Sequence, residues 1–414
     1  MTRIYHKSVL TLLAAAAAAV ALQQAPAATP LNDLGSGLYL NQFQGGLYPN
    51  GSNEVPAAHA AEGIARAAAI RPLGPSGEPD PNGHYVLVSI GMSNTTQEFC
   101  SGNATGPCAS YSFMGKAAAD PRVNHDTLFI VNGAAGGKSA SYWDSPTDPD
   151  YNRIVTDWLT PNGLSEKQVQ AAWVKVANPN PMVSLPDSNA DAYRLARQMG
   201  DISRALKVRY PNLQQIFFSS RIYAGYATTT LNPEPYAYES GLAVKWLIEA
   251  QIHQMTGGGV DPLAGNLDYT SGVAPWIAWG PYMWADGLNA RSDGLIWEQS
   301  DFNSDGTHPA TSGRTKVGTM LLDFVLDSPF TQPWFLRPVP GDYNFDGTVD
   351  AADYVIWRKN DGMPAGYDTW RANFGEPAGN GSATTANATV PEPTTLVMLI
   401  VAAVGIRLWR RHIA

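Results

Sequence analysis

Between residues 84 and 330, short apolar runs alternate with stretches of helical periodicity. The runs are rich in Val, Ile, Phe or Trp and do not alternate with polar residues: Tyr85–Gly91, Thr127–Gly133, Ala172–Asn178, Gln215–Ser220 and Ala274–Gly280. Such continuous runs suit parallel strands that are buried on both faces. Ala190–Tyr210 and Tyr236–Met255 place apolar residues at helical spacing. The pattern predicts an α/β domain of three layers, with a five-stranded parallel sheet between helices.

Polar and glycine residues follow the first three runs, at the carboxyl edge of the predicted sheet, where α/β proteins bind ligands. Ser93 follows the first run closely, so its hydroxyl can project from a tight turn or cap the next helix. The second run leads into a glycine-rich loop in which Gly137, with Gly133 and Gly136 as alternatives, can offer a backbone N–H to an anion. The loop lacks the spacing of a phosphate-binding loop. Asn178 ends the third run, where its amide can donate to a ligand or it can form an ordinary turn before Pro179.

A fourth block, Asp305-Gly-Thr-His308-Pro, precedes a helical stretch at Ser312–Leu326. A carboxylate three residues before a histidine can hold one ring nitrogen while the other faces a nucleophile. Taken alone, the block also suits a capped helix start or a metal-binding pair. The sequence therefore leaves these three interpretations of Asp305 and His308 open.

The four blocks follow the chain order serine, glycine, asparagine and Asp-x-x-His, and in this order they resemble the SGNH hydrolases, or GDSL-type esterases. The resemblance covers Tyr85–Phe330 and implies their three-layer, flavodoxin-like fold. Asn94 after the serine is nearer to the branch that includes sialate and xylan O-acetylesterases, while Met92 stands where the family usually has Asp. Asn178 lies in Val-Ala-Asn-Pro, where the family usually has Gly-x-Asn-Asp.

The resemblance implies a role for each block. Ser93 is then the nucleophile, and the N–H groups of Ser93 and Gly137 form an oxyanion hole with the amide of Asn178. His308 is the base, and Asp305 orients it. These roles imply an ester hydrolase that needs no cofactor for catalysis and acts on carbohydrate or another ester, O-acetyl groups on carbohydrate being the favoured substrate.

A second hypothesis is a non-catalytic carbohydrate-binding or surface-assembly protein that keeps the same fold. Aromatic residues crowd the segment before Asp305: Trp276, Trp279, Tyr282, Trp284 and Trp297. They can form core or offer ring faces to a sugar. The intact Ser93, Asp305 and His308 favour the enzyme, because a binding protein has no need of all three.

A small module follows at residues 341–376. The oxygen donors of a twelve-residue calcium loop occupy its positions 1, 3, 5, 7, 9 and 12: Asp342, Asn344, Asp346, Thr348, Asp350 and Asp353. A helix over Ala351–Lys359 is predicted to follow. Asp353 in place of Glu, and the phrases YVIWRKN and YDTWRANFG, resemble dockerin modules, which implies a cohesin-like or cell-surface partner. The short stretch between these phrases leaves no room for a second loop.

Both ends of the chain have the pattern of sorting signals. Residues 1–28 place Arg3 and Lys7 before an apolar run and Ala-Pro-Ala, the order of a secretory signal peptide. Residues 390–414 combine Pro-Glu-Pro, a short apolar run and terminal arginines, which resembles the PEP-CTERM signal of exported bacterial proteins. That resemblance implies cleavage by a membrane protease, with a membrane anchor as the alternative. The remaining predicted segments are an N-terminal extension at 29–83, the hydrolase domain at 84–337 and a linker at 377–389.

Charge and cysteine content limit the partners and the compartment. The formal net charge is −9 and no basic run lies inside the body of the chain, which argues against nucleic acid as a partner. The two cysteines, Cys100 and Cys108, lack the further ligands of a metal site. In an exported protein we expect them to form a disulfide.

Overall fold

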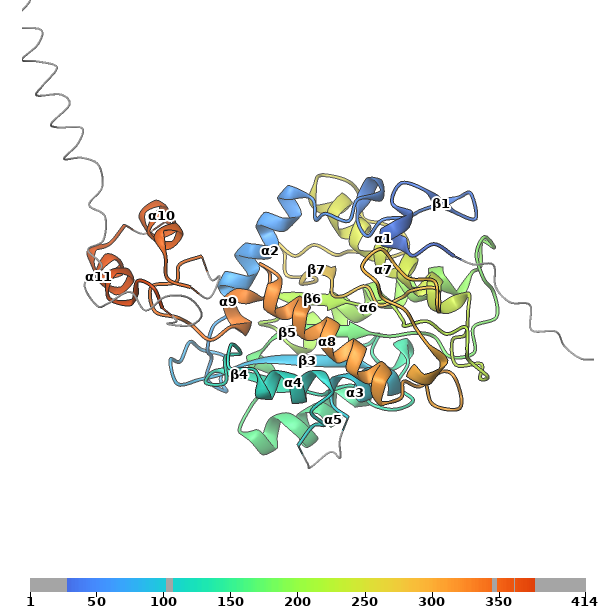
Figure 1. The fold of residues 1–414 in the computed structure, drawn as a ribbon, viewed down its shortest axis with the longest axis horizontal. Helices are drawn as coiled ribbons and strands as arrows, with labels where there is room; N and C mark the ends of the chain where they lie inside the picture. The colour runs from blue at the N-terminus through green and yellow to red at the C-terminus, as the bar shows by residue number, and fades with distance from the viewer. Residues whose placement is uncertain (1–27, 102–106, 345–347, 361, 377–414) are drawn as a thin grey trace, which may run out of the picture. The chain divides into compact units, whose positions relative to one another are not determined.

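The computed structural model describes residues 28–101, 107–344, 348–360 and 362–376 (Figure 1). The predicted signal peptide up to residue 27, the linker at 377–389 and the predicted sorting signal at 390–414 lie outside these residues, as does Asp346 of the predicted calcium loop. The described residues up to Pro338 belong to one compact unit, and those from Val339 to Asn344 and from Thr348 onward to a second. No helix within them combines the length and the apolar character that a membrane span requires.

The first unit is built on a parallel sheet. Its strands, in the spatial order β4-β3-β5-β6-β7, are β3 (Tyr85–Gly91), β4 (Leu128–Val131), β5 (Val169–Lys175), β6 (Gln215–Phe218) and β7 (Trp276–Trp279). Every neighbouring pair in this sheet is parallel. The predicted five-stranded parallel sheet is therefore confirmed. Strands β3, β5, β6 and β7 are buried on both faces as their composition indicates, whereas the edge strand β4 is partly exposed at Phe129 and Ile130.

The third strand lies three residues earlier than predicted, at Val169–Lys175 rather than Ala172–Asn178. A short helical turn capped by Ser165 leads directly into it. At its other end Lys175 pairs with Gly91, the last residue of β3. Beyond Gly91 the neighbouring chain turns into a helix, so β5 has no strand to pair with on that side, and Asn178 lies in the loop.

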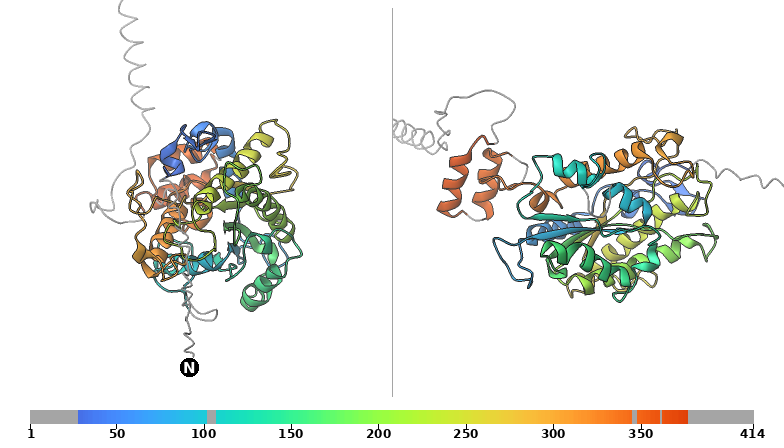
Figure 2. Two further views of the ribbon diagram at one scale, coloured as in Figure 1. Left: turned by 90° about the vertical axis from the view of Figure 1, so that its right-hand side faces the viewer. Right: turned by 90° about the horizontal axis from the view of Figure 1, so that it is seen from below.

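Helices cover both faces of the sheet, which gives three layers (Figure 2). One face packs against α5 (Pro149–Ile154), α6 (Asp191–Arg209) and α7 (Tyr236–Met255). The other packs against α2 (Ala57–Ala69), α3 (Ser93–Phe99), α4 (Phe113–Ala119), α8 (Thr311–Asp327) and α9 (Gln332–Phe335). Along β3, Val86 and Val88 pack on the face covered by α5, α6 and α7, and Leu87 packs on the opposite face. Side chains of a strand alternate between its two faces in this way.

The predicted N-terminal extension belongs to the first unit. It contains α1 (Leu31–Leu34), β1 (Leu38–Tyr39), β2 (Phe43–Gln44) and α2. Leu31 is fully buried, and its backbone N–H donates to the Tyr282 hydroxyl at 3.1 Å. Residues before the predicted domain therefore complete its core.

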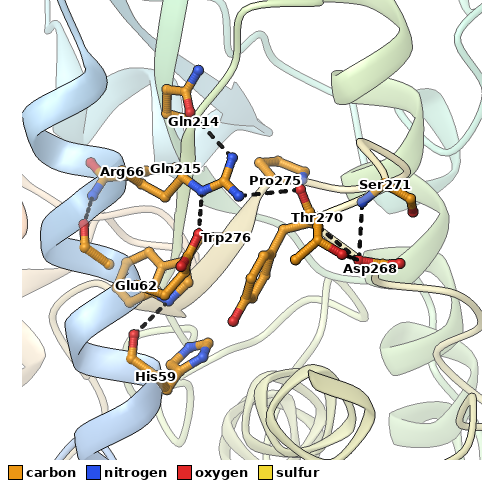
Figure 3. Close-up of polar contacts among 12 residues, drawn as sticks. His59, Glu62, Arg66, Gln214, Gln215, Asp268, Thr270, Ser271, Pro275 and Trp276 are labelled. Atoms are coloured by element: carbon orange, nitrogen blue, oxygen red, sulfur yellow. Dashed lines mark hydrogen bonds and ion pairs between the residues drawn. The ribbon is translucent and has the colours of Figure 1, made fainter. Parts of the chain in front are cut away.

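Figure 3 shows how α2 is fixed against the last strand of the sheet. The Trp276 indole of β7 donates to the His59 carbonyl at 3.0 Å, and Arg66 donates to the Gln214 side-chain oxygen at 3.5 Å. A Cβ at Gly63 would lie 2.3 Å from the Trp276 ring, so only glycine permits this approach. The five aromatic residues noted in the sequence are all at most 5% exposed, so they form core.

The second unit contains α10 (Ala351–Asn360) and α11 (Pro364–Asn373), of which α10 agrees with the helix predicted at 351–359. Aromatic rings pack between the helices: the Tyr354 and Trp370 centroids are 5.1 Å apart, and those of Trp357 and Tyr367 are 5.6 Å apart. The Trp370 indole also donates to the Asp350 carbonyl at 2.6 Å. Tilted aromatic rings in contact therefore give this small unit a core of its own.

Candidate active site

Ser93 is the first residue of α3, which begins directly after β3 and Met92. The turn requires glycine at Gly91, whose φ is +154° and whose Cβ would lie 2.2 Å from the Lys175 carbonyl oxygen. This close approach lets the chain reverse into the helix at the carboxyl edge of the sheet. The turn brings Ser93 to the edge where the sequence predicts a site.

A chain of hydrogen bonds joins Ser93 to the fourth block. Ser93 Oγ lies 2.9 Å from His308 Nε2, and His308 Nδ1 lies 2.5 Å from Asp305 Oδ2. The other carboxylate oxygen of Asp305 accepts the backbone N–H groups of Thr307 and His308, each at 3.0 Å. The arrangement can move a proton from a hydroxyl to an imidazole that a carboxylate holds in place.

The carboxylate of Asp305 is kept ionised by its hydrogen bonds. Partial burial alone would raise its pKa, but the bonds from His308 and Thr307 outweigh burial and hold the pKa below the ordinary value. Asp305 is therefore charged at neutral pH and can stabilise a protonated imidazole.

The loop that carries His308 is tied to α3, the helix that begins with Ser93. The buried Asn94 amide donates to the Thr307 carbonyl at 3.0 Å, across 213 residues of chain. Gly306, at φ +62°, has no room for a side chain, because a Cβ would lie 1.8 Å from the Tyr226 carbonyl oxygen. Asn94 is thus a site residue whose positioning contact the sequence did not reveal, although it adjoins Ser93.

A cavity of about 210 Å³ brings the remaining predicted residues together. It is lined by Met92, Ser93, Asn94, Gly137, Ser139, Ala177, Asn178, Pro179, Arg221, Leu231, Asn232, Thr307 and His308. The set includes Ser93, Gly137, Asn178 and His308, and omits the five predicted aromatic residues. The sugar-stacking role left open for those rings is therefore wrong for this cavity.

The two loops expected to supply oxyanion donors are bonded to each other. The Ala140 N–H donates to the Ala177 carbonyl at 3.1 Å, which joins the loop of Gly137 to that of Asn178. Asn178 is 4% exposed, and its Nδ2 has no hydrogen-bond partner among the residues that the structure describes. A buried amide donor without an acceptor is rare, and Asn178 is among the residues that line the cavity.

The glycines of the second block have different surroundings. A Cβ at Gly133 would lie 2.6 Å from the Ser89 carbonyl oxygen, so Gly133 serves close packing. Gly137 has a φ of +76° and nothing within 4 Å of its Cβ position, and it lines the cavity. Asn132 anchors this loop: its Nδ2 donates to Thr96 Oγ1 at 2.7 Å, a contact that the sequence did not predict.

A buried ion pair joins β5 to α3, the helix that begins with Ser93. Lys175 Nζ, at the end of β5, lies 2.6 Å and 2.5 Å from the two carboxylate oxygens of Glu98 on α3, and both side chains are fully buried. Burial raises the pKa of Glu98 and lowers that of Lys175 to about 8, while each charge offsets part of the other's shift. A lysine inside the apolar run AWVKVAN was the signal that the sequence offered for this pair.

The predicted disulfide joins Cys100 to Cys108, with Cα atoms 4.9 Å apart. Cys100 caps the carboxyl end of α3, the helix that begins with Ser93. The bond therefore fixes the chain that leaves the nucleophile's helix.

The predicted calcium loop is described in part, because Asp346 lies outside the described residues. Asp353 is fully buried, and one of its oxygens accepts the N–H groups of Tyr343 and Asn344, at 2.7 Å and 3.0 Å. Its other oxygen accepts the Asp350 N–H at 2.8 Å, so the carboxylate lies between the two ends of the loop. Within the described ranges, no three His, Cys, Asp or Glu side chains gather as a metal site. The donor chemistry of the loop fits calcium, which prefers oxygen ligands.

We expect Lys175→Met to lower the free energy of unfolding by about 3–5 kcal/mol, because it leaves Glu98 buried without its partner. Urea unfolding followed by tryptophan fluorescence measures this loss. The control is Arg194→Met, which breaks an ion pair with Asp191 whose arginine is 52% exposed; there we expect less than about 1 kcal/mol. Equal losses in the two variants would contradict the importance given to the buried pair.

Comparison with known proteins gives weak matches. No protein-family model and no curated protein matches the chain. Among solved structures, a protein from Arabidopsis thaliana is 14% identical over 58% of this chain and 96% of its own, with a TM-score of 0.31. A carbohydrate esterase family 2 enzyme from Myceliophthora fergusii is 12% identical over 59% of this chain and 66% of its own, with a TM-score of 0.30. A carbohydrate acetylesterase from Xanthomonas citri is 11% identical over 57% and 54%, with a TM-score of 0.29. Matches of this strength carry no argument about activity, so the function must be argued from the geometry.

Proposed function

We propose that the protein is an exported serine ester hydrolase of the SGNH type, which removes short acyl groups, O-acetyl above all, from carbohydrate. One observation carries the proposal: the hydrogen-bonded chain Ser93–His308–Asp305 ends at a cavity that also holds the unpartnered amide of Asn178. A protein that only binds sugar has no use for a hydroxyl aligned on an imidazole in this way.

The reaction follows from these positions. His308 Nε2 takes the proton of Ser93 Oγ as this oxygen attacks the ester carbonyl, and later returns it to the departing alcohol. Asp305 accepts the His308 Nδ1–H and so fixes the tautomer that leaves Nε2 free to act as base. The charge on the carbonyl oxygen is taken by N–H groups of Ser93 and Gly137 and by Asn178 Nδ2. Water then attacks the acyl group on Ser93 in the same way and releases the acid.

The size and lining of the cavity support a small acyl group on a polar alcohol. About 210 Å³ is below the range of roughly 300–1,000 Å³ that sites for drug-sized ligands occupy. Asn94, Ser139, Asn232 and Thr307 line it with groups that can bond to hydroxyls. Export is supported by the leader pattern at residues 1–28 and by the Cys100–Cys108 disulfide.

Ser93→Ala and His308→Ala are each expected to remove nearly all turnover of short-chain aryl esters and acetylated polysaccharides. The double variant should be little worse than either, because the two groups act as one unit. Initial rates of the purified mature protein measure this, with the exposed Ser300→Ala as the matched control. Activity retained by Ser93→Ala on every ester that the unaltered protein cleaves would rule out the mechanism. No activity in any variant or in the unaltered protein would favour the non-catalytic hypothesis.

Asn178→Ala is expected to lower kcat by about 10²–10³-fold, the effect of removing one oxyanion donor. Steady-state rates on one aryl acetate measure this, with circular dichroism to verify folding. The exposed Asn189→Ala provides the matched control and should change kcat by less than twofold, on the order of an ordinary surface substitution. Wild-type turnover in Asn178→Ala would remove Asn178 from the oxyanion hole and leave Ser93 unaffected.

We also infer that the loop of the second unit binds calcium and stabilises that unit. Its support is the complete oxygen donor set in the sequence and the buried position of Asp353. The cohesin-like or cell-surface partner and the cleavage of residues 390–414 stay predictions.

Asp346→Ala should abolish calcium uptake in calorimetry, since it removes the ligand at position 5, and should leave ester hydrolysis nearly intact. Asp368→Ala, an exposed carboxylate on α11, is the control and should bind calcium normally. Unchanged uptake in Asp346→Ala would show that the loop is not the calcium site.

A further inference from the structure

Arg221 is a buried cation in the wall of the catalytic cavity. It lies in the segment that follows β6, at the same carboxyl edge as Ser93, and its backbone N–H donates to Ser240 Oγ at 3.0 Å. The side chain is 2% exposed and lines the cavity with Ser93, Asn178 and His308. Its Nε and Nη2 have no hydrogen-bond partner among the described residues.

The two carboxylates that act on Arg221 electrostatically are already bonded to other donors. Glu98 holds Lys175 Nζ with both of its oxygens. Glu234 accepts the Trp284 indole at 2.8 Å and the backbone N–H groups of Ala224 and Tyr238, at 2.9 Å and 3.0 Å. They can balance the charge of the guanidinium, but Nε and Nη2 lack acceptors among the described residues, and buried donors without acceptors are disfavoured.

The cavity itself supplies donors in excess. No Asp or Glu belongs to the set of described residues that line it. Among those residues Arg221 and Asn178 have N–H groups without partners, and the Oδ1 of Asn232 is an acceptor without a partner. If Asn178 faces the oxyanion of the reacting ester, an acceptor for Arg221 must come from another part of the substrate. A carboxylate suits a guanidinium best, because its two oxygens match the planar fork of donors.

We propose that Arg221 binds a carboxylate of the substrate, so that the enzyme prefers esters that carry an acidic group, such as an O-acetylated hexuronate. This inference rests on the proposed esterase function and adds the class of substrate. The carboxylate can belong to the sugar or to the acyl chain, and paired esters distinguish the two.

The test compares kcat/KM for matched acidic and neutral esters. The first pair is an O-acetylated methyl glucuronoside against the corresponding glucoside, and the second is an aryl monosuccinate against an aryl butyrate. We expect the unaltered protein to prefer the acidic member of one pair by at least about tenfold, the least that a desolvated charge pair usually gives. Arg221→Met should bring that ratio to about one, mainly through KM, and Arg221→Lys should restore only part of it, since lysine keeps the charge without the fork.

Arg291→Met is the matched control, because Arg291 is also buried but bonds to Asp293 and to backbone carbonyls away from the cavity. It should leave the acidic-to-neutral ratio unchanged. Equal slowing of both members by Arg221→Met, or no acidic preference in the unaltered protein, would overturn the proposal and leave Arg221 a structural residue or one that holds only water. If Arg221→Met does not fold, Arg221→Lys still tests the assignment, because an acidic-to-neutral ratio equal to that of the unaltered protein would overturn it.

Binding without catalysis separates this proposal from the esterase itself. Calorimetry of the Ser93→Ala protein with methyl glucuronoside and with methyl glucoside measures the contact directly. Tighter binding of the acidic sugar by about tenfold or more supports a site for the sugar carboxylate. That result holds whether the protein is an esterase or binds acidic sugars without cleaving them. Equal binding of both sugars, together with equal rates on both members of the succinate pair, overturns the Arg221 assignment while ester hydrolysis stands.

Discussion

Lys175 holds α3, the helix that begins with Ser93, to the sheet through both its backbone and its side chain. Its carbonyl accepts the Thr95 hydroxyl at 2.6 Å and adjoins Gly91, while its ammonium pairs with Glu98 at the other end of α3. Both contacts lie on the strand that leads, three residues later, to Asn178. The distance between the Ser93 hydroxyl and the Asn178 amide therefore depends on the buried Lys175–Glu98 ion pair. Removing one charge of such a pair is strongly destabilising.

The rest of the site is held by bonds between loops that are remote in sequence. Asn94 bonds to the loop of His308 across 213 residues, and Ala135 donates to the Gly91 carbonyl at 3.1 Å. Each loop leaves a different strand at the same edge of the sheet. The site can therefore form only when the parallel strands pair in the correct register. This explains how the positions of Ser93, His308 and Asn178 can be precise although most of the residues around the cavity lie in loops.

Local sequence patterns predicted the strands and most residues of the candidate site. Features that depend on contacts between residues distant in sequence were missed. Apolar runs located the strands, and the chain order of the blocks singled out Ser93, Asn178 and His308, which line one cavity. The end of β5 was misplaced, because the apolar run continues past the last residue that β3 can pair with. Arg221 was missed for a related reason: nothing local distinguishes an arginine that will be buried against a cavity from one that will face water.

Asn178 and Arg221 line the cavity and have buried donors without partners among the described residues. A fold selected for stability alone would give the Asn178 amide and the Arg221 guanidinium acceptors within the protein, since an unmet buried donor costs roughly 1–3 kcal/mol. Elsewhere at this edge the chain does so: Asn132, Asn94 and Thr95 all have their side-chain donors bonded. Among the described residues that line the cavity, the exceptions are Asn178, Arg221 and the Oδ1 of Asn232. Under the proposed function, donors that are kept unbonded and fixed in place need no rearrangement when charge develops on a bound ester. Under the proposed function, the stability forgone at Asn178 and Arg221 is the cost of holding donors ready for an electron-rich ligand.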